Sequence, residues 1–280
     1  MGAIAIQHER EFVFQRADFD KVRASLMQKA GIRLTDAKDG LVYSRLARRI
    51  RALGLSSFAE YLDYVDSSKT EQEQFVNALT TNLTSFFREP HHFDALANYL
   101  HDHPQTTTIW CAASSTGEEP YSIAMVVAEA FGSFKTPVKI IASDIDSNVL
   151  ATARKGIYPM RNIEQIPPQR RKSFFQRGRG TQSDKVRVVK ELRDMVEFRQ
   201  INLQQADWGF NHEVDIIFCR NVMIYFNKET QLKVLNRMVR LLKPGGLYVA
   251  GHSENFNHQT HLVRPIGKTL YQPVKAANGQ

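Results

Sequence analysis

The sequence is poor in cysteine and has no long hydrophobic run. Only two cysteines, Cys111 and Cys219, occur among 280 residues, and both stand in apolar, strand-like stretches. This usage excludes a disulfide-stapled fold and a cysteine-rich zinc site, and it predicts two reduced core residues. No apolar stretch approaches the ~18 residues that a membrane-spanning helix requires, and residues 1–16 lack the features of a secretory signal. We therefore expect a cytoplasmic protein that does not insert into the membrane.

An excess of charge of one sign is also missing outside a single segment. The chain has 37 Lys and Arg against 29 Asp and Glu, a formal net charge of +8. Residues 151–200 contain 13 of the basic and 5 of the acidic residues, so this segment holds the whole imbalance. A smaller basic feature lies near the N-terminus and consists of Arg45, Arg48, Arg49 and Arg51. The surplus therefore indicates two local surfaces rather than a chain that is basic throughout.

The hydrophobic pattern changes near residue 107. The first 80 residues contain amphipathic stretches with helical spacing, Asp or Ser at N-cap positions and Gly at two ends. Short β-rich runs then alternate with amphipathic helices, which predicts a parallel sheet covered on both faces, closed by the hairpin LVRP and TLYQPV. We expect an all-α domain over residues 1–80 and an α/β domain over residues 81–280. Residues 156–194 form a basic insertion in which KVRVV alternates like an edge strand.

The glycine fingerprint of dinucleotide-binding folds is absent from the first strand-to-helix connection. Ala112–Pro120 reads AASSTGEEP, whose small residues let the backbone approach a ligand without the G-x-G-x-x-G spacing. Glu118 and Glu119 fall in the first turn of the next helix, where two carboxylates would repel a pyrophosphate. They suit a ligand with an ammonium or sulfonium group, or they simply complement the helix dipole. A nicotinamide oxidoreductase is disfavoured.

Polar residues follow three further predicted strands, at the edge where ligands bind in doubly wound sheets. Asp144 closes the run IIASD and can accept hydrogen bonds from ribose hydroxyls. Asn202 and Leu203 follow VEFRQI, where the amide either reads an adenine edge or makes a simple turn. The last strand leads into three polar residues of FCRNVMIYF, namely Arg220, Asn221 and Tyr225. Together these ends predict a site for a nucleoside without phosphates, a description that fits S-adenosyl-L-methionine.

Longer motifs follow one another along the chain: NALTTNLTSFFRE (Asn77–Glu89), STGEEPYS (Ser115–Ser122), ASDID (Ala142–Asp146), FCRNVMIYF (Phe218–Phe226), LLKPGGL and GHSEN (Gly251–Asn255). In this order they resemble the motifs of the CheR-type chemotaxis receptor methyltransferases, with no departure at a motif position. The resemblance covers the chain from about Phe19 to Tyr271. It implies a Rossmann-like S-adenosylmethionine-dependent methyltransferase sheet with a small inserted β-subdomain, preceded by a small all-α domain.

The resemblance implies transfer of a methyl group from S-adenosyl-L-methionine to glutamate side chains of transmembrane chemoreceptors. The products are S-adenosyl-L-homocysteine and the glutamate 5-O-methyl esters that tune sensory adaptation. Carried over motif by motif, the implied cofactor site includes residues of the linker 81–95 and of the strand ends: Asn82, Thr84, Arg88, Glu119, Asp144, Asn202, Leu203, Arg220 and Asn221. The residues alone would not select Asn82 or Thr84, because TTNLTSFFRE reads equally as the end of a helix.

The implied reaction needs no general base at the acceptor. A glutamate has an unperturbed pKa of about 4.3, so the nucleophile is already ionised at pH 7. The enzyme has to align the carboxylate oxygen with the methyl carbon and sulfur, and to remove water from the carboxylate. By resemblance, Arg88 and Tyr225 are the catalytic residues. The Arg88 guanidinium is suited to holding one carboxylate oxygen, and the Tyr225 hydroxyl to orienting the other oxygen or the methyl donor.

The basic features take their interpretation from the family. On a helical wheel Leu46 and Ile50 share the apolar face, while three arginines point away and Arg49 lies at its border. We interpret Arg45, Arg48, Arg49 and Arg51 as substrate-binding residues for the acidic cytoplasmic helices of a chemoreceptor; the alternative is a solvated face. In some members the β-subdomain binds a peptide of the receptor's C-terminal tail by strand addition, and for the insertion 156–194 this stays open. We expect a monomer that is recruited to membrane receptor clusters.

Two other function classes compete with this interpretation. A nucleic-acid methyltransferase would suit the basic insertion, but the sequence reads CRNVMIYF where amino-methylating enzymes place a D/N-P-P-Y motif. A non-catalytic module that binds S-adenosylmethionine or receptors would be expected after loss of Arg88 or Tyr225, and both are present. We expect no nucleic-acid partner. We also expect no metal, because the histidines form no ligand set with distant partners: His91, His92, His101 and His103.

Overall fold

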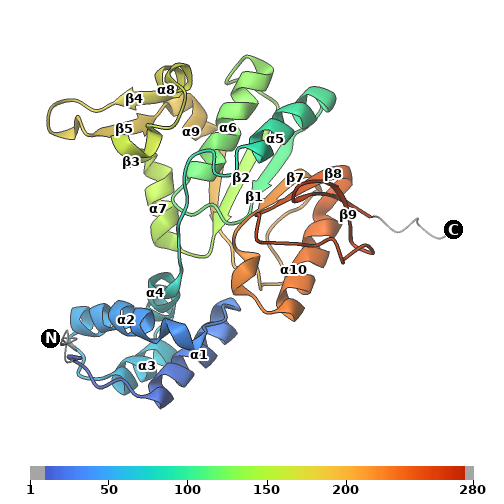
Figure 1. The fold of residues 1–280 in the computed structure, drawn as a ribbon. Coiled ribbons are helices and arrows are strands. Elements are labelled where there is room, and N and C mark those ends of the chain that lie inside the picture. The colour runs from blue at the N-terminus through green and yellow to red at the C-terminus, as the bar shows by residue number, and fades with distance from the viewer. Residues whose placement is uncertain (1–9, 275–280) are drawn as a thin grey trace, which may run out of the picture. The chain divides into compact units, whose positions relative to one another are not determined.

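The computed structural model describes residues 10–274, which divide into two compact units after Thr81 (Figure 1). Residues 1–9, which belong to the stretch considered above as a secretory signal, lie outside the described residues, as do residues 275–280. Each unit has its own buried apolar core. Among residues 10–274, every helix is too short or too polar to cross a bilayer.

Within residues 10–81, the N-terminal unit contains four α-helices and one short 3-10 turn. These are α1 (Arg16–Ala30), η1 (Asp36–Lys38), α2 (Asp39–Leu53), α3 (Phe58–Ser67) and α4 (Lys69–Leu79). Gly31 and Gly54 end α1 and α2 in the left-handed conformation, and the side chains of Ser57 and Ser68 accept amide protons at the starts of α3 and α4. The apolar faces of the helices form one core, which includes the buried residues Phe19, Leu26, Leu46, Ile50, Phe58 and Phe75.

The C-terminal unit is built on a seven-stranded sheet with the order β6-β2-β1-β7-β8-β10-β9. Its strands are β1 (Thr108–Cys111), β2 (Lys139–Asp144), β6 (Val196–Gln200), β7 (Val214–Cys219), β8 (Leu242–Ala250), β9 (Val263–Gly267) and β10 (Leu270–Pro273). The first five in this order run parallel, and β10 pairs antiparallel with both of its neighbours. All residues of β1 and β7 are buried, as expected of central strands covered on both faces.

α5 (His91–Asp102) precedes β1. The helices that follow β1 and connect parallel strands are α6 (Glu118–Phe131), α7 (Ser147–Lys155), the 3-10 turn η4 (Met223–Tyr225) and α10 (Lys228–Leu241). The connections from β1 to β2 and from β7 to β8 lead in opposite directions along the sheet, so right-handed crossovers put α6 and α10 on opposite faces. The strand order therefore reverses between β1 and β7, and ligands of such sheets bind beside this reversal, beyond the carboxyl ends of the strands.

Between α7 and β6 the chain forms a small antiparallel sheet (Figure 1). This inserted subdomain contains β3 (Ile157–Pro159), η2 (Met160–Ile163), α8 (Pro168–Phe174), β4 (Phe175–Arg177), η3 (Gly180–Gln182), β5 (Lys185–Val188) and α9 (Lys190–Asp194), with the strand order β3-β5-β4. The expectation that KVRVV is an edge strand is wrong, because β5 pairs on both sides. Its alternation instead marks two faces of the sheet, with Val186 and Val188 buried and Arg187 exposed.

The predicted fold class is confirmed. A helical unit precedes a Rossmann-like sheet, which carries a small inserted antiparallel sheet. The predicted closing hairpin is also present as β9 and β10, joined through Lys268 and Thr269, and Thr269 has a positive φ of 56°. Cys111 and Cys219 are free and buried, as their apolar surroundings predicted.

Candidate functional site

The connection from β1 to α6 is a tight loop at the point where the strand order reverses. Gly117 has a φ of 99°, and a Cβ there would stand 2.8 Å from the Tyr158 hydroxyl and 2.9 Å from the Ala153 Cβ. Ser115 also has a left-handed φ, of 48°. The Ser114 side chain is buried, and its hydroxyl has no hydrogen-bond partner among residues 10–274. The loop therefore presents backbone groups and one unused hydroxyl to a ligand at the end of β1.

Asp144 ends β2 and directs its carboxylate toward this loop. Its Oδ2 accepts a hydrogen bond from the Ser115 amide at 2.9 Å, and its Oδ1 accepts one from the Asp146 amide at 3.0 Å. Burial raises the pKa of Asp144 to about 6, although the two amide donors oppose this effect. Each carboxylate oxygen has a second lone pair, so Asp144 is able to accept two hydroxyl groups of a ligand.

Asn82 belongs to the same hydrogen-bonded group, although it lies far from Asp144 in the sequence. Its Nδ2 donates to Asp146 Oδ2 at 2.8 Å, and its carbonyl accepts from the Ser115 hydroxyl at 2.9 Å. Asp146 also caps α7 by accepting from two backbone amides. The structure thus joins Asn82 to the ends of both β1 and β2.

Arg220 directly follows β7. It is the cation of a charge network that it forms with Glu119 and Glu89. Its side chain is fully buried and forms an ion pair with Glu119. Its Nη2 donates to the Arg88 carbonyl at 2.5 Å and lies 3.4 Å from Glu89 Oε2, whereas its Nε has no hydrogen-bond partner in the described part of the chain. Glu119 also accepts a hydrogen bond from Cys111 Sγ at 3.3 Å. Glu119 therefore faces a protein cation, because the adjacent ends of β1 and β7 bring the two opposite charges together.

Glu89 is a shared acceptor that the sequence analysis missed. Its carboxylate accepts from the His252 amide at 3.1 Å and from Asn221 Nδ2 at 3.3 Å, beside Arg220. Burial favours the neutral acid, but the charge of Arg220 and the two donors outweigh burial and lower the pKa of Glu89. Its backbone has a φ of 59°, which no sequence pattern announces. The only signal was its position at the end of the motif Asn77–Glu89.

Glu254 in the GHSEN motif was missed as well. Its buried carboxylate accepts four backbone amides at 2.7–3.0 Å, those of Asn221, Val222, Met223 and Gly251. Burial outweighs these donors and raises the pKa of Glu254. Gly251 is needed for the close approach, since a Cβ there would lie 2.8 Å from the Asn221 nitrogen. Glu254 therefore fixes the course of the loop that follows Arg220.

The two predicted catalytic residues, Arg88 and Tyr225, are both half-buried. The Arg88 guanidinium donates to the Leu83 carbonyl at 3.0 Å. Tyr225 ends η4, directly after the loop that Glu254 holds. Within residues 10–274 no hydrogen bond joins the two side chains, and the Tyr225 hydroxyl makes none. Both groups therefore have hydrogen-bonding capacity left for a ligand.

The predicted residues Asn202 and Leu203 lie beside Asp144. Ile201 precedes Asn202 directly. Its amide donates to the Asp144 carbonyl at 3.0 Å and aligns the end of β6 with that of β2. Asn202 Oδ1 accepts from the Gln204 amide at 3.0 Å, which is the turn contact that the sequence left open as an alternative. Leu203 is buried. The structure thus brings these residues to the same end of the sheet as the β1 loop.

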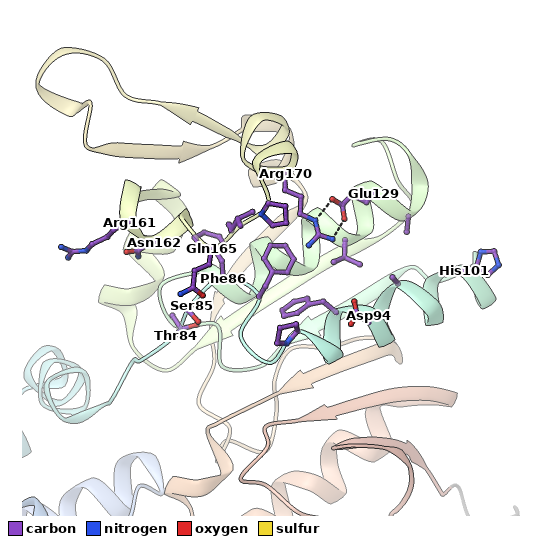
Figure 2. A pocket seen from close by; sticks show the side chains of 18 residues that line it. Thr84, Ser85, Phe86, Asp94, His101, Glu129, Arg161, Asn162, Gln165 and Arg170 are labelled. Atoms are coloured by element: carbon purple, nitrogen blue, oxygen red, sulfur yellow. Dashed lines mark hydrogen bonds and ion pairs between the residues drawn. The ribbon is translucent and has the colours of Figure 1, made fainter.

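Thr84 lines a cavity of about 840 Å³ between α5, α6 and the inserted subdomain (Figure 2). Phenyl rings line it as well, those of Phe86, Phe87 and Phe93. On the wall formed by α6 and α8, Arg170 and Glu129 make a bidentate ion pair, with both hydrogen bonds at 2.8 Å. Of the predicted cofactor residues, only Thr84 is among the residues that line this cavity.

The four predicted substrate-binding arginines of α2 differ in their contacts. Arg49 makes a bidentate pair with the buried Glu71, at 3.0 and 2.6 Å. Arg51 pairs with an exposed glutamate, and Arg45 donates to backbone carbonyls at the end of α4. Arg48 is exposed and has neither a hydrogen bond nor an ion pair within the described ranges. Of the four side chains, that of Arg48 is therefore the one most open to a partner.

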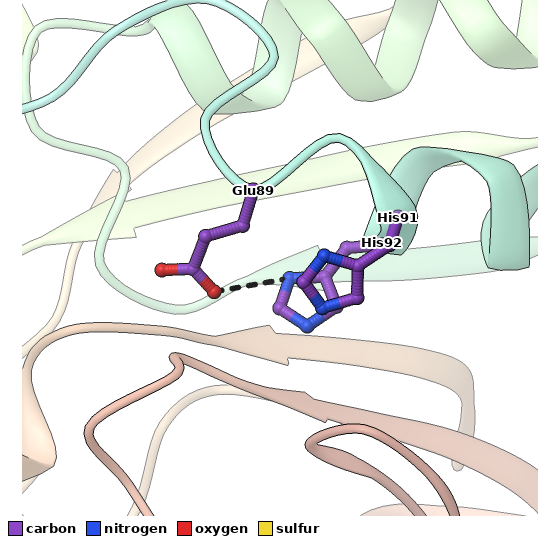
Figure 3. A group of neighbouring side chains, drawn as sticks. All are labelled: Glu89, His91 and His92. Atoms are coloured by element: carbon purple, nitrogen blue, oxygen red, sulfur yellow. Dashed lines mark ion pairs between the residues drawn. The ribbon is translucent and has the colours of Figure 1, made fainter.

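Glu89, His91 and His92 form a local group, whereas the sequence analysis considered the two histidines without Glu89 (Figure 3). One potential ligand atom from each lies within 4.8 Å of the others. Arg220 already supplies the positive charge beside Glu89, and His92 Nε2 is hydrogen-bonded to the Thr269 hydroxyl at 2.7 Å. Burial lowers the pKa of His92 to about 3, so this ring is neutral at pH 7. We therefore assign Glu89 to the charge network of Arg220 rather than to a metal site, and the neutral His92 lies beside it.

Comparisons with known proteins match almost the entire chain to one family. Residues 17–80 match the family described as CheR methyltransferase, all-alpha domain, and residues 82–272 match CheR methyltransferase, SAM binding domain. The chain is 57% identical over 268 residues to chemotaxis protein methyltransferase 2 of Pseudomonas aeruginosa, covering 95% of this chain and 96% of that relative. It is 45% identical over 271 residues to the chemotaxis protein methyltransferase of Salmonella typhimurium, covering 96% and 94%. The Escherichia coli protein of the same name is 44% identical over 271 residues, with coverages of 96% and 95%.

Proposed function

The chain belongs to the CheR family of S-adenosylmethionine-dependent methyltransferases of chemotaxis, and we propose that it methylates glutamate carboxylates of chemoreceptors. The product would be a glutamate 5-O-methyl ester. The observation that supports this most is that two polar contacts, Ser115 with Asp144 and Arg220 with Glu119, lie at the ends of neighbouring strands where the strand order reverses. Labelled methyl transfer to membranes that contain chemoreceptors tests the proposal. Absence of labelled receptor despite normal cofactor binding would reject it.

The residues at this end of the sheet fit S-adenosyl-L-methionine, which supplies a methyl group bound to a positively charged sulfur. Asp144 has lone pairs left for ribose hydroxyls, and Glu119 is able to accept from an ammonium group. The Ser114 hydroxyl and Arg220 Nε are buried polar groups without a partner in the described residues, which a bound ligand can satisfy. We assign the cofactor site to the predicted residues Asn82, Thr84, Arg88, Glu119, Asp144, Asn202, Leu203, Arg220 and Asn221.

The catalytic roles follow from the chemistry of the acceptor. The substrate glutamate is ionised at pH 7, so the enzyme has to orient its carboxylate and exclude water from it. We assign the holding of one carboxylate oxygen to the Arg88 guanidinium and the orientation of the reacting groups to the Tyr225 hydroxyl. Glu254 acts through the backbone, because it fixes the loop that leads from Arg220 to Tyr225, and Glu89 contacts the same loop through the Asn221 side chain.

Cofactor binding should weaken in acid because of Asp144. Its pKa is raised to about 6 in the ligand-free protein, and only the ionised carboxylate can accept from both ribose hydroxyls. The affinity for S-adenosylhomocysteine should therefore fall by up to about tenfold per pH unit below pH 6. Calorimetry between pH 5 and pH 8 measures this. The variant Asp144→Ala should bind S-adenosylhomocysteine more weakly by roughly 1–3 kcal/mol.

The control for this pH profile is Asp144→Asn, which cannot titrate and should give weak, pH-independent binding. The pH dependence of folding stability has the opposite sign to the pH dependence of cofactor binding. Because the folded-state pKa lies above the ordinary value of 3.8, the contribution of Asp144 to folding is most favourable below that value. It is lost as the pH rises through about 6. A wild-type affinity that stays constant from pH 8 to pH 5 would contradict the assignment of Asp144.

The substrate surface is assigned to the predicted arginines of α2, above all Arg48. Arg48→Glu should leave cofactor binding unchanged and lower the rate of receptor methylation about five- to tenfold at low salt, because exposed charges act mainly through steering. The methylation rate of the wild type should also decline more steeply with added salt than the rate of Arg48→Glu. Lys21→Glu is the matched control, since it makes the same charge change on an exposed site of α1. Equal rates for Arg48→Glu and the wild type would contradict the docking role.

We further assign a receptor tail peptide to the inserted subdomain. Its outer strands β3 and β4 each pair on one side only, which leaves an edge for strand addition. Arg171 and Lys172 are basic and have no acidic partner among the described residues, in contrast to Arg170, which pairs with Glu129. Substitution of Arg171 and Lys172 rather than Arg170 is therefore the suitable probe. We propose a monomer that acts in the cytoplasm at receptor clusters.

A further inference from the structure

The inserted subdomain contacts the β1 loop of the proposed cofactor site directly through Tyr158. This side chain of β3 is 2% exposed, and its hydroxyl donates to the Thr116 carbonyl at 2.8 Å. Thr116 lies in the β1 loop, between Ser115, which donates to Asp144, and Gly117, which the Tyr158 hydroxyl adjoins. Within residues 10–274 the one hydrogen bond of the Tyr158 hydroxyl thus ends on a segment that shapes the cofactor site.

A second contact holds the linker that precedes α5. Phe86 is 8% exposed and lies edge-on to two rings of the subdomain. Its ring centroid is 5.0 Å from that of Tyr158 on β3 and 5.4 Å from that of Phe175 on β4. Aromatic pairs in this geometry stabilise beyond the burial of their area. The linker is therefore anchored to the inner face of the small sheet.

Phe87, the next residue, is held by Arg170 of α8. The guanidinium carbon of Arg170 lies 4.6 Å from the centre of the Phe87 ring, and Glu129 fixes the guanidinium by two hydrogen bonds (Figure 2). The Phe87 amide donates to the Ser122 hydroxyl at 3.0 Å, and Phe87 has a positive φ of 53°. A non-glycine residue keeps such a backbone only when its surroundings hold it there.

The two residues that follow, Arg88 and Glu89, both contact Arg220. The Arg88 carbonyl accepts from Arg220, and Glu89 binds the loop through Asn221. We propose that the inserted subdomain positions the cofactor site, with Tyr158 and Arg170 as the positioning residues. Tyr158 sets the β1 loop, and Arg170 sets the linker that carries Arg88. The proposal rests on the cofactor site alone and does not depend on which carboxylate is methylated.

The test measures S-adenosylhomocysteine affinity by calorimetry in the full chain. Tyr158→Phe removes one hydroxyl and keeps the ring, and Arg170→Ala removes the cation above Phe87. Each variant should weaken binding about three- to tenfold, the range expected for one hydrogen bond or one cation–π contact. In methylation assays, the KM for S-adenosylmethionine should rise by a similar factor while kcat changes little. Arg170→Lys keeps a cation beside Glu129 and should recover part of the affinity.

Arg179→Ala is the matched control, because it removes an exposed cation of the same inserted subdomain, which makes no ion pair in residues 10–274. Its affinity for S-adenosylhomocysteine should equal that of the wild type. Wild-type affinity in folded Tyr158→Phe and Arg170→Ala would overturn the proposal, even if both variants unfold at lower temperature. An equal loss in Arg179→Ala would overturn it too. If Tyr158→Phe does not fold, the one-third exposed Arg170 still carries the test.

Discussion

Arg220→Met should destabilise the protein by about 3–5 kcal/mol in the free energy of unfolding, because it leaves buried carboxylates without their cation. Glu119 and Glu89 both face Arg220, whose side chain has no exposed surface. The same variant should lower the affinity for S-adenosylhomocysteine about 100-fold, since the Arg88 carbonyl and the Asn221 loop lose a common partner. Denaturant unfolding and calorimetry measure the two effects separately.

A double variant distinguishes the structural from the binding role of Arg220. Arg220→Met combined with Glu119→Gln removes both charges of the closest pair, and should recover much of the lost stability. It should not recover affinity, because both groups are assigned to the cofactor site. A single Arg220→Met variant that binds S-adenosylhomocysteine normally would contradict the assignment of the network to the site.

Tyr225→Phe should lower kcat about 10- to 100-fold, the range for one hydrogen bond to a charged group, and leave S-adenosylhomocysteine affinity unchanged. The Tyr225 hydroxyl makes no hydrogen bond in the described chain, so its loss should not disturb the fold. Arg88→Ala should reduce both kcat and cofactor affinity, because Arg88 belongs to the linker and its carbonyl accepts from Arg220 of the charge network. Steady-state kinetics and calorimetry measure the difference between the two variants.

The comparison of these two variants also separates their roles. If Tyr225→Phe turns over at the wild-type rate, Tyr225 has no part in the reaction. If Arg88→Ala reduces affinity without reducing kcat, Arg88 serves the cofactor rather than the carboxylate of the substrate. Each result would remove one residue from the proposed catalytic pair.

Local sequence patterns were sufficient to predict most elements of the fold. The apolar spacing of α2 identified that helix and Gly54 marked its C-terminal end, and the apolar run of β7 identified a central strand. The pattern failed for β5, because a period of two reports which side chains are buried and says nothing of whether a strand has one neighbour or two.

Without the family resemblance, residues of the candidate site could be proposed only where they follow strands. Asp144 and Arg220 are polar groups directly after apolar runs, which is visible in the sequence. Glu89 and Glu254 were missed because their partners are contacts with distant segments, and neither a positive φ nor a ring of amide donors leaves a periodic signal. For the same reason the wheel of α2 placed Arg49 at a border and gave no sign of its pair with Glu71.

The chemical identity of the transferred methyl group tests the central claim most directly. Receptor-containing membranes are incubated with the enzyme and S-adenosylmethionine labelled in its methyl group, and the labelled receptor is then treated with mild base. Glutamate methyl esters should release the label as methanol, and Tyr225→Phe should reduce the yield of releasable label at early times. Label that stays on the protein after base treatment, or that appears only on nucleic acid, would contradict methylation of glutamate carboxylates.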